Sequence, residues 1–229
     1  MNLRAHFATE LAQLQTGLID LGDLVSQAIQ QAVHALLERD QALARQVIEG
    51  DEQINRRRFD WEERALELLA TQSPVASDLR LMAAGMHLVD ELERMGDHAK
   101  GIARISLLIG ETPLIYPEIP LAPMAEQTCS LLSQALASFI NRDAKLAEQV
   151  GLRDDEIDLL YNRIASALFE LMFSDRNNIE QANRLLWAAH NLERIGDRIT
   201  NICERVIFVC TGKLVEISGM AAREQPRLE

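Results

Sequence analysis

The sequence is poor in proline and cysteine, and it has no excess of basic residues. Only 6 of its 229 residues are proline, and four of these fall within positions 113–123, so long helices are expected elsewhere. The 3 cysteines show no Cys-x-x-Cys spacing, which argues against both a thiolate zinc site and a disulfide framework. A helical protein with reduced, buried cysteines is therefore expected.

The formal net charge of −12 argues against a broad basic face. Nucleic acids and anionic lipid surfaces both require such a face, so neither is expected as a partner. The acidic balance instead favours cations or a protein partner. No uninterrupted apolar run approaches the roughly 18 residues of a membrane span, and the N-terminus lacks the pattern of a signal peptide. We expect a cytoplasmic protein.

Hydrophobic periodicity predicts three helices in the first half of the chain. Apolar residues recur with alternating steps of four and three over 7–35, which is typical of a long helix packed in a bundle. Asp40 predicts the N-cap of a second helix, which the Ser-Pro pair at 73–74 ends. A third helix is predicted over 77–109. Trp61, at helical spacing, is predicted to pack in the core, and so is Trp187 in the second half.

The second half of the chain repeats the first. Arg142-Asp143 parallels Arg39-Asp40, and the acidic segment 154–158 parallels 51–55. One helix is predicted from about 143 to 174 and another from about 179 to Gly212, a residue suited to a helix stop. We predict an all-α fold of two tandem three-helix bundles related by internal duplication. The predicted boundaries are a first bundle at 1–110, a stiff Pro-rich linker at 111–123, a second bundle at 124–212 and a C-terminal tail at 213–229.

The most informative stretch is Glu-Leu-Glu-Arg-Met-Gly-Asp-His-Ala at 91–99, which recurs as Asn-Leu-Glu-Arg-Ile-Gly-Asp-Arg-Ile at 191–199. In each copy a Glu and an Asp lie four residues apart, which stacks the two carboxylates on one face of a helix. Like charges at that spacing repel, and a glycine inside a helix costs roughly 1 kcal/mol relative to alanine. A sequence that accepts both costs twice indicates a function.

The hairpins predicted around Pro74 and Arg176 bring each motif alongside the acidic segment of the preceding helix, 51–55 or 154–158. Clustered carboxylates repel one another and raise one another's pKa values unless a cation neutralises them. Oxygen-rich clusters with few imidazoles suit ions such as Mg, Mn or Fe. One metal site per bundle is therefore predicted, and the second is richer because Asp158 takes the place of Asn55.

Other interpretations of these residues stay open. Glu93 and Asp97 could pair with arginines such as Arg56, Arg57 or Arg94, as an exposed ion-pair face of a plain helical scaffold. His98 and His190 flank the motifs and could be ligands, although neither has a counterpart in the other repeat. A carboxylate-bridged metal-binding or iron-storage protein is the alternative function. Such ferritin-type proteins use Glu-x-x-His pairs, and this sequence contains none.

Three segments, 74–80, 91–99 and 191–202, together with the length and the duplication, closely resemble the PhoU family of bacterial phosphate-transport accessory and regulatory proteins. The resemblance implies two three-helix bundles related by a pseudo-twofold axis, each binding multinuclear clusters of divalent or trivalent metal ions (Fe, Mn, Mg or Zn). On matching positions the implied ligands are Asp51, Asn55, Glu93, Asp97, Asp154, Asp158, Glu193 and Asp197. Asn55 departs from the acidic pattern, and Arg198 stands where family members often carry histidine.

The resemblance also implies a regulatory role. PhoU-like proteins repress the phosphate-starvation (Pho) response by linking the high-affinity phosphate ABC transporter to a sensor histidine kinase, and so modulate phosphate uptake. They act in the cytoplasm or at the periphery of the inner membrane, often as homodimers. The sequence shows no nucleophile with a positioned base and no Gly-rich phosphate loop, so no enzymatic activity is expected.

Overall fold

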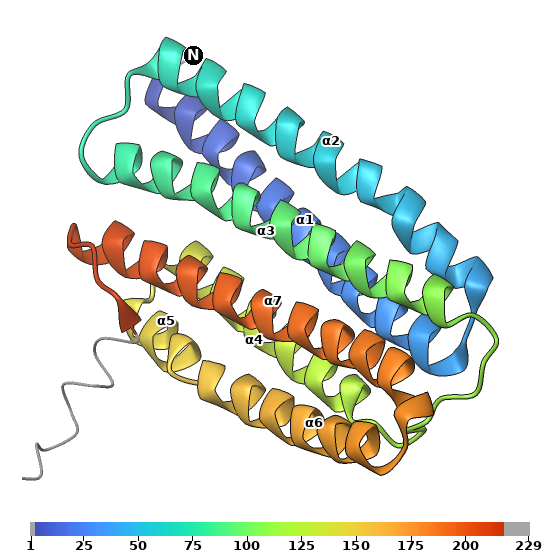
Figure 1. Ribbon diagram of the computed structural model, residues 1–229. Helices are drawn as coiled ribbons and strands as arrows, with labels where there is room; N and C mark the ends of the chain where they lie inside the picture. The colour runs from blue at the N-terminus through green and yellow to red at the C-terminus, as the bar shows by residue number, and fades with distance from the viewer. Residues whose placement is uncertain (1–2, 218–229) are drawn as a thin grey trace, which may run out of the picture.

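A computed structural model describes residues 3–217 of the chain (Figure 1). These residues form seven α-helices and one short 3-10 helix, with no strand among them. The α-helices are α1 (Leu3–Glu38), α2 (Gln41–Gln72), α3 (Ser77–Ile109), α4 (Leu121–Asn141), α5 (Ala144–Gly151), α6 (Asp154–Ser174) and α7 (Ile179–Thr211), and the 3-10 helix η1 spans Arg176–Asn178.

The predicted all-α architecture of two three-helix bundles is confirmed. Helices α1, α2 and α3 pack together as one bundle, and α4, α7 and the pair α5–α6 pack as the other. The bundles join through α3 against α7 and α1 against α4. Figure 1 shows α3 and α7 side by side in the middle of the molecule, with α2 and α6 on its two outer sides.

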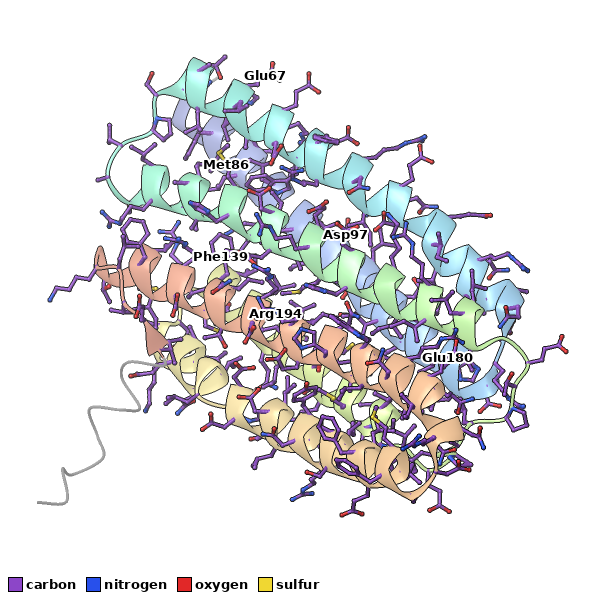
Figure 2. All side chains as sticks on the ribbon, viewed as in Figure 1. Glu67, Met86, Asp97, Phe139, Glu180 and Arg194 are labelled. Carbon is purple, nitrogen blue, oxygen red and sulfur yellow. The ribbon has the colours of Figure 1, made fainter. Side chains whose placement is uncertain are left out.

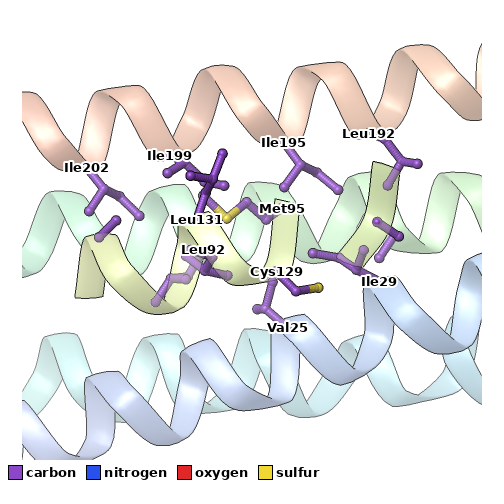
Figure 3. Packing of buried hydrophobic residues seen from close by; sticks show 14 of the residues in the cluster. Val25, Ile29, Leu92, Met95, Cys129, Leu131, Leu192, Ile195, Ile199 and Ile202 are labelled. Carbon is purple, nitrogen blue, oxygen red and sulfur yellow. The ribbon is translucent and has the colours of Figure 1, made fainter. Parts of the chain in front are cut away.

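The two bundles share one continuous hydrophobic core. Figure 3 shows Val25 of α1, Met95 of α3, Cys129 of α4 and Ile195 of α7 meeting at the junction of the bundles. Burial raises the pKa of the Cys129 thiol to about 11, so this cysteine behaves as a small apolar side chain. Cys129 and Cys203 are buried as predicted, whereas Cys210 is exposed. Because apolar surface is buried between the bundles as well as within them, the halves are held as one body.

The helix boundaries follow the capping residues read from the sequence. Asp40 Oδ1 accepts hydrogen bonds of 2.9 Å from the backbone N–H groups of the second and third residues after it. Its counterpart Asp143 caps α5 in the same way, with a bond of 3.0 Å. Ser73 ends α2 and Gly212 ends α7, both with left-handed backbone conformations. Local capping interactions therefore fix where these helices begin and end, and with them the positions of the residues along each helix.

The prediction of one helix over 143–174 is wrong in one respect, because the structure has two helices there, α5 and α6. Gly151, the last residue of α5, packs against the buried side chain of Ile217. The first turn of α6 carries three acidic residues, which favour a helix N-terminus through the helix dipole. The break places Asp154 as the first residue of a helix.

Three further details differ from the sequence-based expectation. Helix α4 begins at Leu121, so Pro123 lies in its first turn, where the missing N–H is tolerated, and not in the linker. Trp61 is buried as predicted, whereas Trp187 is 55% exposed. Within the predicted tail, Ile217 is buried and its N–H donates to Glu204 Oε1 over 3.0 Å.

The rest of the predicted tail, residues 218–229, and the first two residues of the predicted first bundle lie outside the described residues. Of the helices within 3–217, none has the length and apolar character needed to cross a membrane.

Candidate functional site

The glycine inside each repeated motif lies where two helices approach closely. A Cβ atom added to Gly96 would lie 2.8 Å from Ile54 Cδ1, and one added to Gly196 would lie 2.6 Å from Asp154 Oδ1. The bare backbone lets the acidic segment of α2 or α6 reach the motif on α3 or α7. This close packing explains why the sequence accepts glycine in the middle of two long helices.

The first cluster comprises Asp51, Asn55, Glu93 and Asp97, and a lysine lies between two of its carboxylates. Asp51 is only 4% exposed, and its Oδ2 lies 2.5 Å from Lys100 Nζ. The same ammonium group is 3.6 Å from Asp97 Oδ1. Asn55 Nδ2 donates to Asp51 Oδ2 over 3.4 Å. The hydrogen bond to Asp51 raises the pKa of Lys100, so the lysine stays charged.

Within the acidic segment 51–55, the structure distinguishes the residues that face the first motif from those that face solvent. The buried acid is Asp51, whereas Glu52 is exposed and forms an ion pair with Arg56. Burial and then Asp97 raise the pKa of Glu93, and Arg58 partly opposes this rise. The guanidinium group of Arg58 is itself held by Asp90 on α3 at 2.8 Å. The ion-pair interpretation therefore differs from the contacts in the structure, because Arg56 pairs with Glu52 and the basic group beside Asp97 is Lys100.

The second cluster comprises Asp154, Asp158, Glu193 and Asp197. Burial raises the pKa of Asp154 to about 7, and the neighbouring charges of Asp158 and Asp197 add to the rise. The buried hydroxyl of Thr200 opposes it only in part. Burial and Asp197 likewise raise the pKa values of Glu193 and Asp158. Four carboxyl groups from α6 and α7 are therefore close enough to destabilise one another's ionised forms.

Few cations face the second cluster. Arg194 Nη1 lies 2.7 Å from Asp197 Oδ2, and Figure 2 labels Arg194 on α7 and Asp97 on the neighbouring α3. His190 Nδ1 lies 3.2 Å from Glu193 Oε2, yet that buried oxygen accepts no well-formed hydrogen bond from the described part of the chain. An orphaned buried carboxylate oxygen marks a place where a cation would be stabilised.

The two histidines near the motifs differ in what they contact. His98 Nδ1 lies 2.9 Å from Asn191 Oδ1 and so links α3 to α7. Burial lowers the pKa of His98, which favours the neutral imidazole. The ring of His190 lies 5.6 Å from the ring of Trp187 and 6.1 Å from that of Tyr161. Only His190 therefore touches a carboxylate of either cluster.

The residues of the two clusters differ in their suitability for a metal ion. Among residues 3–217, no three His, Cys, Asp or Glu side chains are already arranged as a metal site. The second cluster supplies only carboxylates and has an orphaned oxygen, a donor set that hard cations prefer once the side chains close around the ion. The first cluster already contains an ammonium group between two of its carboxylates.

Sequence reasoning missed the role of Lys100 and of its counterpart Thr200, each three residues after the Asp of its motif. Lys100 follows Asp97 by three residues on the same helix. The pairing rule for residues three apart on a helix would have placed its side chain beside Asp97.

Comparison with known proteins decides the family. The model of the PhoU domain matches residues 18–106 and 121–206, once in each bundle. The chain belongs to the PhoU family. A PhoU homolog of Pseudomonas putida, called a phosphate-specific transport system accessory protein, is 36% identical over 96% of this chain and 86% of its own length. A homolog of the same name from Clostridium acetobutylicum is 35% identical over 94% of this chain and 99% of its own.

Solved PhoU structures have the same fold. The crystal structure of PhoU from Pseudomonas aeruginosa covers 90% of this chain and 100% of its own with a TM-score of 0.83 and 35% identity. The phosphate transport system regulatory protein PhoU from Streptococcus pneumoniae covers 91% of this chain and 99% of its own with a TM-score of 0.84 and 34% identity. The duplicated bundles of this chain are thus the PhoU arrangement.

Proposed function

We propose that this protein is a non-enzymatic regulator of phosphate uptake. It acts as a negative regulator of the phosphate-starvation response, as an adaptor between the high-affinity phosphate ABC transporter and its sensor histidine kinase at the inner membrane. The observation that carries this proposal is the PhoU match in both bundles, with relatives named as accessory proteins of the phosphate-specific transport system.

Exposed apolar side chains support an adaptor role. Phe59 and Leu66 of α2 are 59% and 54% exposed, and Phe169 and Phe173 of α6 are 47% and 89% exposed. Leu66 and Phe169 occupy equivalent positions of the two repeats, since each lies fifteen residues after the first acid of its segment, Asp51 or Asp154. Large exposed apolar residues on the outer helices of a bundle are suited to contacts with protein partners, or with a second copy in a homodimer.

The adaptor proposal is tested in a bacterium that lacks its own copy of this protein. A phosphate-starvation reporter should be on at high phosphate in the deletion strain and off when the parent protein is restored. The double variant Phe169→Ser, Phe173→Ser should fail to restore repression, whereas Leu108→Ser should restore it, because Leu108 is similarly exposed on another helix. A reporter that stays off in the deletion strain would contradict the proposal.

The second cluster adds a proposed cofactor. Asp154, Asp158, Glu193 and Asp197 would together hold a divalent or trivalent cation such as Mn, Fe, Mg or Zn. The bound ion would supply positive charge that neutralises the four carboxylates and ties α6 to α7. The raised pKa values and the orphaned Glu193 oxygen support this assignment.

The metal proposal is tested by elemental analysis of protein purified without chelator or affinity metal. The parent should carry metal, and Glu193→Gln, Asp197→Asn should lose it. Removal of the metal by a chelator should lower the melting temperature of the parent but not of that variant, because a ligand that binds only the folded state raises stability. Negligible metal in the parent would refute the assignment, and a large excess of iron per chain would favour iron storage instead.

A further inference from the structure

The position of Lys100 gives the first cluster its own cation. The lysine side chain is 21% exposed, and its Nζ lies between a carboxylate oxygen of α2 and one of α3, at 2.5 Å from Asp51 and 3.6 Å from Asp97. A bound metal ion would occupy the same place, bridging acids from the two helices of the hairpin. An ammonium group so placed neutralises charge and links the helices by hydrogen bonds, with no need for metal.

The equivalent position of the second repeat has no such cation. Thr200 replaces Lys100, and Asp158 replaces Asn55. The second cluster therefore has one more carboxylate than the first, and it lacks the lysine that bridges two carboxylates of the first. The only basic side chains within ion-pair distance of its carboxylates, among the described residues, are Arg194 and His190, both about two-fifths exposed. The duplicated halves thus differ at the two positions that decide the charge balance.

We propose that Lys100 is a built-in counter-ion that takes the place of metal in the first cluster, so that only the second cluster of this protein exchanges metal. The statement about the first cluster rests on the contacts of Lys100 with Asp51 and Asp97. The statement that the second cluster differs rests on the metal site proposed above. The two bundles would then differ in their response to metal. The first keeps its geometry with or without metal, and the second changes with the supply of cations.

The test exchanges the two residues that differ. We would measure Mn²⁺ bound per chain by equilibrium dialysis for the parent, Lys100→Thr, Thr200→Lys and the double exchange. Lys145→Thr is the matched control, because it removes a lysine from the exposed surface of α5, away from both clusters. Lys100→Met keeps the aliphatic stem and replaces Lys100→Thr if that variant does not fold. Circular dichroism spectra establish that each variant folds.

The expected result is a gain of one Mn²⁺ site in Lys100→Thr over the parent and the Lys145→Thr control, and a loss of the parent's site in Thr200→Lys. The gain requires the first cluster to be able to close on a metal once the lysine is gone, with three carboxylates and one amide as ligands. The double exchange should bind as many ions as the parent, but at the first cluster, so that Asp97→Asn added to it abolishes binding.

Failure of this inference can be told from failure of the proposed metal site. If the parent binds Mn²⁺ through Asp197 and Lys100→Thr binds no more, the second site stands and the role of Lys100 is refuted. If the parent binds none but Lys100→Thr binds Mn²⁺ through Asp97, the role of Lys100 stands and the second site is refuted. A parent that already binds Mn²⁺ through Asp97 would also overturn the inference.

Discussion

Replacement of Asp154 by asparagine should stabilise the metal-free protein at neutral and alkaline pH. The folded state raises the pKa of this carboxyl from 3.8 to about 7, because the group is buried beside Asp158 and Asp197. Between these two pH values the folded state holds a proton that the unfolded state has released. The free energy of unfolding therefore falls as the pH rises from about 4 to about 7, and the penalty is complete above pH 7.

The magnitude follows from the size of the shift. One pKa unit corresponds to 1.36 kcal/mol, so a rise of about three units would cost about 4 kcal/mol for a fully shielded group. Asp154 is only partly buried, and solvent screening reduces the expected cost to about 1–2 kcal/mol. Asparagine keeps the shape and one carbonyl oxygen of the side chain but cannot ionise, so it removes this cost.

Urea unfolding at several pH values, with chelator present, measures the effect. Asp154→Asn should be more stable than the parent by about 1–2 kcal/mol at pH 8, and this difference should vanish or reverse near pH 4. Asp155→Asn is the matched control, because Asp155 is exposed on the same turn and its loss should change stability by no more than about 0.5 kcal/mol. Equal stability of Asp154→Asn and the parent at pH 8 would refute the electrostatic strain assigned to this cluster.

Four further substitutions test the local packing and capping of the helices, each by urea unfolding. Gly96→Ala should destabilise the fold by about 1–2 kcal/mol, because the added Cβ would clash with Ile54. Gly50→Ala should instead stabilise α2 by about 0.5–1 kcal/mol, because its Cβ would meet nothing within 4 Å. A Gly96→Ala variant more stable than the parent would contradict the close approach of α2 and α3. Asp40→Ala should cost about 1 kcal/mol by removing the cap of α2, and no loss would mean that the cap contributes nothing. Trp61→Phe should cost about 2 kcal/mol because it removes a buried 2.8 Å hydrogen bond, and a loss below about 0.5 kcal/mol would show that water replaces it.

Local signals in the sequence were enough to predict the fold. The 3.6-residue period, the cap at Asp40 and the stop at Gly212 each depend on neighbours along the chain, and the structure confirms them. The break between α5 and α6 could not be predicted in this way. Gly151, at the break, lies against Ile217, which is far away in the sequence, and a contact of this kind leaves no local pattern.

The sequence was enough to predict which acidic residues of α2 and α3 lie near one another, but not which basic side chain neutralises them. Periodicity and the repeat placed the acids of α2 and α3 on facing sides of one hairpin. Whether Lys100 reaches Asp51 depends on the rotation of each helix about its axis, because a shift of one residue would turn Asp51 outwards and Glu52 inwards. Hydrophobic spacing fixes that rotation only to within about one residue. The contact between Lys100 and Asp51 therefore could not be predicted from the sequence.

The junction of the bundles keeps the symmetry that the clusters have lost. His98 of α3 contacts Asn191 of α7, and at the equivalent positions Arg198 of α7 contacts Glu91 of α3 at 3.4 Å. The two helices are therefore antiparallel. In each motif, the residue after the Asp contacts the first residue of the other motif. One of these contacts is neutral and the other is ionic, yet both hold the same register. A duplicated chain can change the charge of one half in this way without disturbing the packing of the two halves, as the difference proposed between the two clusters requires.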